Sequence, residues 1–381
     1  MTNRYLPLLL LIVTAAVPLS AQSQTEAFPL LGDSVQVAAI EAAARTLEAE
    51  ISSGHPEVLT EWFDSNAFLD RANEDRQIGA VTMMTLRSEF RDGSVLLSDI
   101  TTQLREGGRF KFLRIVERDG SLRARFRFLS PTSSLNYHDL LLVPDSSGSA
   151  GFVDTYVFYS AEDLSDTIGR LMEMMAAEGS LSPRVKAYDE FFTLFNAGHY
   201  RDAWNAFPAE HIDPSNRKAL MLMRIQLGMN VGDREYHQAL DDFIDAFPDD
   251  PSLALLLIDI HFNNGEYEAM LETVDRLEVS VGGDSYLSVL RAFAHLELDA
   301  PVTALEEARR ARQGEPELLI PNLAEFRALV VLEHFDEAVA SLQRMTDQGF
   351  ELDLHNIESD PINEAFVLSE PYLMWREELY R

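Results

Sequence analysis

The second half of the chain repeats one short residue pattern at nearly equal intervals, and this feature constrains the fold more than any other. In its fullest form the pattern is a glycine at Gly198, an aromatic residue at Tyr200 and a small residue at Ala203. The position of the small residue recurs at 203, 239, 270, 304 and 338, so the intervals are 36, 31, 34 and 34 residues. Such a period is typical of stacked pairs of helices, in which each unit covers the apolar face of the next.

The residues of the pattern have simple roles in a helix pair. The glycine permits the short turn that ends the first helix, the aromatic residue starts the packing of the second helix, and the small residue lets the two helices approach closely. Pro251 and Pro316 each stand 12 residues after a small residue, where the chain cannot remain helical. The other members of the pattern are Tyr236 and Ala239, then Gly265, Tyr267 and Met270, then Pro301 and Ala304, and finally Phe335 and Ala338.

With this period and spacing, residues 183–350 resemble about five degenerate tetratricopeptide repeats. The early tryptophan of the family's first helix is missing, and Met270 and Pro301 replace a small and an aromatic residue. Residues 351–381 look like the closing helices of such an array, and we expect their outer face to be polar. The resemblance implies an all-α solenoid with a concave groove that binds a peptide or a protein, and it implies no chemistry.

The first half of the chain differs, because its apolar periodicity changes from helical to alternating at residue 109. Apolar residues at helical spacing predict helices between residues 35 and 106. Alternation predicts four strands, at residues 109–116, 122–129, 134–144 and 151–158. A closing helix is expected at residues 167–177. The predicted fold class for residues 30–178 is therefore an α+β domain, with helices followed by a four-stranded antiparallel sheet. Its order and length resemble a cystatin-like or nuclear-transport-factor-2-like cone.

Basic residues are concentrated in one part of this domain. Residues 1–182 contain fifteen basic residues, and ten of them lie between residues 87 and 127. Arg123, Arg125 and Arg127 share one face of the second strand, and Arg109 and Lys111 lie across the hairpin. We expect these five residues to form a positive sheet face. Such a face is either a solvent-exposed surface paired with carboxylates, a surface that docks on the acidic repeats of the same chain, or a site for an anionic ligand or partner.

The chain as a whole is strongly acidic, with a net charge of −32. This charge argues against nucleic-acid binding, which needs lysine and arginine to neutralise phosphates. Residues 183–381 hold 38 acidic and 16 basic residues. This acidity either keeps the surface solvated or selects basic segments in the groove. Its most visible clusters are Asp241-Asp242, Asp249-Asp250 and Glu306-Glu307.

The first residues carry the pattern of a secretory signal. Arg4 precedes an apolar run from residue 6 to residue 21, and small or polar residues follow up to Ser23. Cleavage after Ala21 or after Ser23 fits this pattern. The run has about 16 residues, fewer than the roughly 20 that a membrane-spanning helix needs. We therefore predict that residues 1–23 are removed and that the protein is exported, as to a bacterial periplasm, with no membrane span remaining.

Motifs for chemistry are missing from the sequence. The chain has no cysteine, no phosphate-binding loop, no serine nucleophile elbow and no paired histidines, so no cofactor or metal is expected. The one candidate is a sheet-lined pocket, in which burial could raise the pKa of an acid, formed by Tyr137, His138, Asp139, Asp154 and Tyr156.

From these patterns we expect a non-enzymatic binding or scaffold protein whose repeats recruit a peptide or protein partner. The alternative is a small-ligand carrier or an enzyme that uses a cavity in the N-terminal domain.

Overall fold

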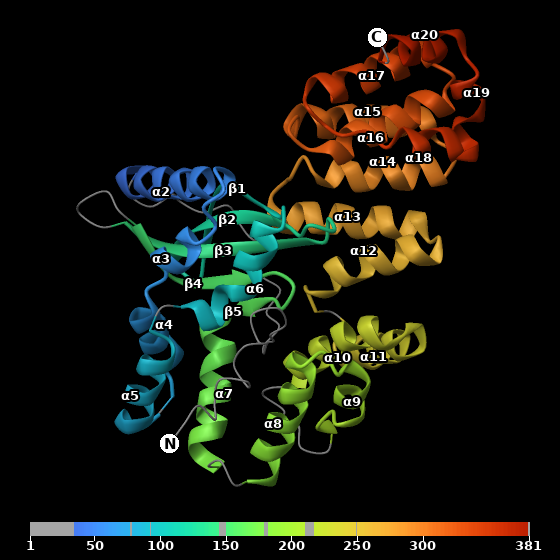
Figure 1. Cartoon of the computed structure of the whole chain (residues 1–381). Helices are drawn as coiled ribbons and strands as arrows, with labels where there is room; N and C mark the ends of the chain where they lie inside the picture. The colour runs from blue at the N-terminus through green and yellow to red at the C-terminus, as the bar shows by residue number, and fades with distance from the viewer. Residues whose placement is uncertain are drawn as a thin grey trace. The chain divides into compact units, whose positions relative to one another are not determined.

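The computed structural model describes residues 34–76, 78–91, 93–144, 150–178, 182–209, 217–248 and 250–379 (Figure 1). The predicted signal segment, residues 1–23, lies outside these ranges. The chain divides into two compact units, the first ending at Leu255 and the second beginning at Leu256. The predicted junction between the α+β domain and the repeats, near residues 178–183, lies inside the first unit.

The first unit begins with helices, as the apolar spacing predicts. Helix α2 buries Ile40, Ala44 and Leu47 on one side, and it ends before Gly54, whose φ of 91° suits glycine. Asp64 caps the start of α4, because its carboxylate accepts hydrogen bonds from the backbone N–H groups of residues 66 and 67. The helices that precede the sheet are α2 (Ser34–Ser52), α3 (Val58–Trp62), α4 (Ser65–Ala72), α5 (Ala80–Glu89) and α6 (Ser94–Arg105).

An antiparallel sheet with strand order β1-β2-β3-β4-β5 follows these helices. Asp119 and Gly120 both have positive φ, 51° and 72°, which is the geometry of a tight hairpin turn. The sheet has five strands and not the predicted four, because β5 has two residues, too few for an alternation signal. The strands are β1 (Arg109–Arg118), β2 (Ser121–Leu129), β3 (Leu135–Pro144), β4 (Ala150–Val157) and β5 (Glu162–Asp163).

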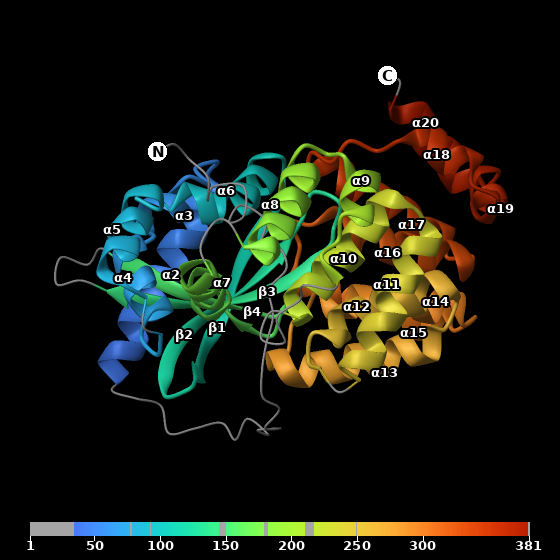
Figure 2. The same cartoon turned by 90° about the horizontal axis from the view of Figure 1, so that it is seen from below.

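One face of the sheet is filled by aromatic side chains. Phe110 pairs with Phe128 and Phe112 pairs with Phe126 across β1 and β2, and the rings of Phe110 and Phe126 stack at 4.5 Å. Helix α2 packs against β1, β2 and β3, and helix α7 (Leu164–Glu178) packs against β4 and α4. The strands therefore lie between α2 and α7 (Figures 1 and 2).

The rest of the described chain is helical, as expected for the C-terminal half. The first unit continues with α8 (Pro183–Asn196), α9 (Tyr200–Asn205), α10 (Arg217–Val231) and α11 (Asp233–Ala246), and α12 (Leu253–Asn264) crosses the boundary between the units. In the second unit each helix from α13 to α17 packs against the next one. These helices are α13 (Tyr267–Val281), α14 (Leu287–Glu297), α15 (Pro301–Gly314), α16 (Leu319–Val331) and α17 (Phe335–Asp347).

Four helix pairs are joined by the same turn. One or two residues after the end of the first helix, the backbone has a left-handed φ, which is 73° at Gly198, 73° at Gly265, 54° at Asp299 and 57° at Glu333. In each case the next N–H donates to a carbonyl five residues earlier, as from Ala300 to His295 at 2.9 Å. The sequence predicts this turn at the two glycines, and the structure has it also at two acidic residues.

Short helices close the second unit. They are α18 (Leu354–Ser359), η3 (Pro361–Asn363), α19 (Glu364–Val367) and α20 (Glu370–Leu379), the last of which packs against α17. Within the described ranges, no helix has both the length and the apolar character that crossing a membrane requires.

Candidate functional site

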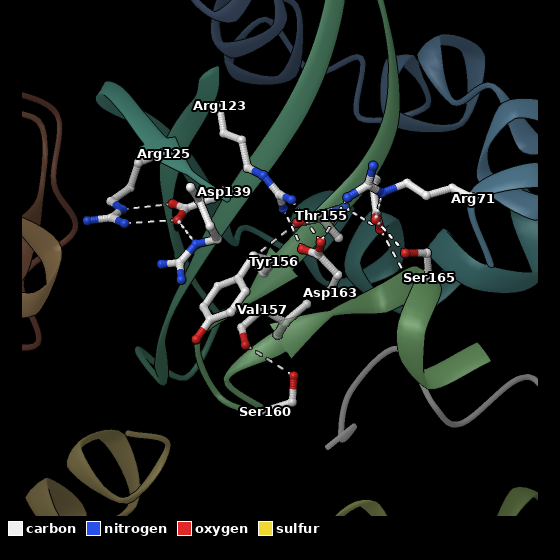
Figure 3. A network of polar contacts seen from close by, with 12 residues as sticks. Arg71, Arg123, Arg125, Asp139, Thr155, Tyr156, Val157, Ser160, Asp163 and Ser165 are labelled. Atoms are coloured by element: carbon white, nitrogen blue, oxygen red, sulfur yellow. Dashed lines mark hydrogen bonds and ion pairs between the residues drawn. The ribbon is translucent and has the colours of Figure 1, made fainter. Parts of the chain in front are cut away.

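The arginines of β2 are buried, in contrast to our expectation of an exposed positive face. Arg123, Arg125 and Arg127 are 0%, 1% and 1% exposed, whereas Arg109 is exposed and Lys111 is half-buried. The reason is that carboxylates of β3 and β5 lie on the same face of the sheet, where Asp139 pairs with Arg125 and Asp163 pairs with Arg123 (Figure 3). A buried charge is tolerated only when it is paired in this way.

Asp139 on β3 is the first centre of this buried network. Arg125 binds it with two parallel bonds, from Nε at 2.7 Å and from an Nη atom at 2.8 Å. Arg118 donates a further bond from Nε at 3.2 Å. The guanidinium of Arg118 also lies 3.5 Å from the centre of the Tyr156 ring, a cation–π contact. Both carboxylate oxygens of Asp139 therefore accept bonds from arginines.

The second centre consists of Asp154 on β4 and Asp163 on β5. Arg123 makes a two-pronged ion pair with Asp163, with one of its bonds at 2.8 Å. Arg71 joins the two acids, donating to Asp154 at 2.6 Å and to Asp163 at 3.2 Å. The hydroxyl of Ser165 donates to Asp154 at 2.6 Å (Figure 3). Helix α4, strand β2 and the start of α7 are thereby tied to one pair of carboxylates.

The two acids differ in their pKa shifts. Burial, together with the charge of Asp163, raises the pKa of Asp154 to about 6, although Ser165 and Arg71 favour its charged form. Burial also acts to raise the pKa of Asp163, but the hydrogen bonds and charges of Arg123 and Arg71 hold that pKa below its usual value. Asp163 is thus the more acidic of the two carboxyl groups.

Glu162, beside Asp163, forms a third buried group. It accepts bonds from Arg170 at 2.7 Å and from the hydroxyl of Thr167. Burial raises the pKa of Glu162 to about 7 in spite of these donors. Lys218 at the start of α10 is 1% exposed and pairs with Asp250. The field of Lys218 also reaches Glu162, so a helix of the repeat region contributes to the electrostatics of the sheet domain.

The pocket predicted from the sequence is not assembled as one site. Tyr137, Asp139, Asp154 and Tyr156 lie on the polar face, with Asp139 directly paired with Tyr156 in the register of β3 and β4. His138 points to the opposite, aromatic face, where its ring lies 5.8 Å from that of Phe110 and 6.2 Å from that of Phe128. Burial lowers the pKa of His138 to about 4, so this side chain is a neutral core residue at pH 7.

Sequence reasoning missed Arg71, Asp163 and Ser165 as members of the network. Arg71 could have been noticed as a basic residue close to the buried side of a short helix. No local pattern marks the other two. Among the described residues there is no group of three or more histidines and acids that could hold a metal ion.

The predicted packing residues of the repeats all lie in the helix pairs. Ala203, Ala239, Ala304 and Ala338 are at most 1% exposed, and Met270, the larger substitute, is 2% exposed. The aromatic residues Tyr200, Tyr236, Tyr267 and Phe335 are half-buried. Tyr200 and Tyr267 each contact a phenylalanine five residues earlier, with ring centres 5.6 and 6.0 Å apart. Gly198 and Gly265 form the left-handed turns described above.

The acidic clusters of the repeats have different surroundings. Asp241, Asp242 and Glu306 are exposed, whereas Glu307 is buried and bonded to Arg310. Asp250 pairs with Lys218, and Asp249 lies outside the described residues. Only part of the predicted acidic surface is therefore available to a partner.

A buried glutamate organises the last helix pairs. Glu325 on α16 is 3% exposed and accepts bonds from Arg309 at 3.3 Å, Arg312 at 2.5 Å and Arg344 at 2.7 Å. These arginines come from α15 and α17, so one carboxylate links three consecutive helices.

Comparison with known proteins adds no family or relative. No protein family, curated protein or solved structure matches the chain.

Proposed function

We propose that this protein is an exported, non-enzymatic binding protein whose C-terminal helix pairs recruit a protein or peptide partner. The observation that carries the proposal is the recurrence of one turn at Gly198, Gly265, Asp299 and Glu333, with a buried residue at every small position. A regular array of helix pairs orients successive helix surfaces in the same way and forms an extended binding surface. On this basis the array is a degenerate tetratricopeptide solenoid.

The sheet domain has a supporting role in this proposal. Its buried acids Asp139, Asp154 and Asp163 are each held by arginines, and its other face is filled by phenylalanines. Such paired groups serve better as a rigid scaffold than as a proton donor or a ligand cavity. This favours binding over the alternative of a carrier or an enzyme, and it is compatible with the cystatin-like resemblance of the domain.

Affinity purification of the full chain from the cells that produce it tests the proposal. We would compare the wild type with V331S, which alters an exposed residue of α16, and with V279S/V302S, which alters exposed residues of α13 and α15. The control is V81S/M84S on α5, since these side chains are 77% and 69% exposed in the first unit. A partner that is reduced in an array variant and retained in the control supports the proposal. Loss in the control alone contradicts it.

Export is tested separately by the mass of the mature protein. The proposal expects residues 1–21 or 1–23 to be missing, because both cleavage positions fit the signal pattern. A protein that retains residues 1–23 would contradict a cleaved signal.

A further inference from the structure

The closing helices of the second unit form a strongly acidic segment. Residues 351–379 contain eight acidic residues and one basic residue, Arg376. Arg376 donates to Glu358 at 3.1 Å, so the positive charge of this arginine is already partly compensated within the segment. A positively charged partner is therefore the electrostatic complement of this segment.

One side of α20 is fixed against the body of the unit. Tyr372 and Trp375 are 1% and 5% exposed. The indole N–H of Trp375 donates to Gln343 of α17 at 2.9 Å, and the hydroxyl of Tyr372 donates to Glu358 at 2.8 Å. These anchors determine which side chains of α20 face outward.

The outward side of α20 is not the polar face that we expected of a closing helix. Leu373 and Met374 are 51% and 60% exposed, and Leu368, just before the helix, is 72% exposed. Together with exposed glutamates these residues follow helical spacing along one side. We call this surface the α20 stripe, and it consists of Glu370, Leu373, Met374, Glu377 and Glu378.

We infer that the α20 stripe binds a basic amphipathic helix of a partner protein. The apolar pair Leu373 and Met374 would pack against the apolar side of that helix, and methionine adapts well to such contacts. The glutamates at both ends of the stripe would attract lysine or arginine at the edges of the partner helix. The inference rests on the proposed function, because it names the kind of partner that the second unit recruits.

The direct test uses a synthetic helix of leucine and lysine, about 18 residues and five turns long. Its affinity for the full mature protein is measured by fluorescence anisotropy. A scrambled peptide of the same composition and an amphipathic leucine–glutamate peptide serve as probe controls. We expect the leucine–lysine helix to bind, and both control peptides to bind at least about tenfold more weakly.

Two variants separate the apolar and the charged contributions. L373S/M374S should weaken peptide binding by about tenfold or more, because it removes the apolar centre. E370Q/E378Q should weaken binding mainly at low salt, because rim charges act through screened attraction. V81S/M84S, which alters two exposed aliphatic residues of α5, should bind like the wild type. Thermal unfolding of each variant shows whether the fold is retained.

Any one of the following results would overturn the inference. The peptide fails to bind, it binds L373S/M374S as well as the wild type, or the wild type forms dimers that L373S/M374S abolishes. The last result would assign the stripe to a second copy of the chain. If the partner captured by the full chain is lost in the array variants and retained in L373S/M374S, this inference fails while the proposed function stands.

Discussion

Arg123 of β2 and Asp163 of β5 form a two-pronged ion pair, although β3 and β4 lie between their strands in the sheet. The side chain of Arg123 is fully buried and that of Asp163 is 10% exposed. Folding therefore removes both charges from water and replaces their hydration by direct contact with each other. Either residue without the other would be a buried charge with no compensating partner.

Asp163→Asn should strongly destabilise the first unit, because it leaves Arg123 buried without its carboxylate. Removing one partner of a buried ion pair typically costs about 3–5 kcal/mol. Urea unfolding monitored by circular dichroism measures the loss. The matched control is Glu41→Gln, which breaks the exposed pair with Arg45 on α2 and should cost no more than about 0.5 kcal/mol. Equal losses for the two variants would show that the buried pair is not a major stabilising contact.

Glu162 should make the protein less stable as the pH rises from about 4.5 to 7. Its pKa is raised to about 7 in the folded state, so the folded protein holds this proton more tightly than the unfolded chain. This stabilisation is complete when the pH is below the unfolded pKa, and it is lost as the pH rises through the folded pKa. The free energy of unfolding changes by about 3 kcal/mol over this range. Unfolding curves of wild type and Glu162→Gln at several pH values measure the difference. A pH dependence that is identical in the two proteins would contradict the assignment.

His138 should have the opposite effect over an overlapping range. Burial lowers the pKa of His138 to about 4, so the folded protein prefers the neutral ring. The stabilisation from the neutral ring is present when the pH is above the unfolded pKa near 6.5, and it is lost as the pH falls towards 4. The free energy of unfolding again changes by about 3 kcal/mol. His138→Phe should remove this acid sensitivity and keep a ring beside Phe110 and Phe128. The same unfolding series checks it, and undiminished acid sensitivity in the variant would refute the prediction.

Asp299→Gly and Glu333→Gly should each stabilise the second unit. Both residues adopt the left-handed backbone that glycine occupies at Gly265, with φ of 54° and 57°. A side chain in this conformation costs about 1 kcal/mol, which glycine avoids, although the greater freedom of glycine in the unfolded chain offsets part of the gain. Thermal unfolding should therefore show a small rise in Tm. Asp336→Gly, inside the first turn of α17, is the control and should lower Tm.

The sequence predicts much of the local structure, because helices and strands are encoded by nearby residues. The alternation through Arg123, Ala124, Arg125 and Phe126 places the arginines on one face of β2. It does not reveal that this face is buried, since the acid that pairs with Arg123 lies 40 residues later in the chain. Alternation alone separates the two faces of a strand, but it does not show which of these faces is exposed to water.

The closing helix shows a similar limit. Tyr372, Leu373, Met374 and Trp375 are four consecutive apolar residues, so periodicity does not tell which two are buried. Packing on α17 selects Tyr372 and Trp375 and leaves the other two on the surface. The α20 stripe could therefore be recognised only from the structure.

The most direct test of the central claim, that the C-terminal helix pairs bind the partner, is photo-crosslinking in the producing cells. A photoreactive amino acid is placed at Phe262, Val279, Val302 or Val331 of the array, or at Val81 or Met84 of α5, all of which are exposed. The account predicts a discrete adduct with another protein from at least one array position and none from α5. Adducts from α5 alone, or no adduct from any array position, would contradict it.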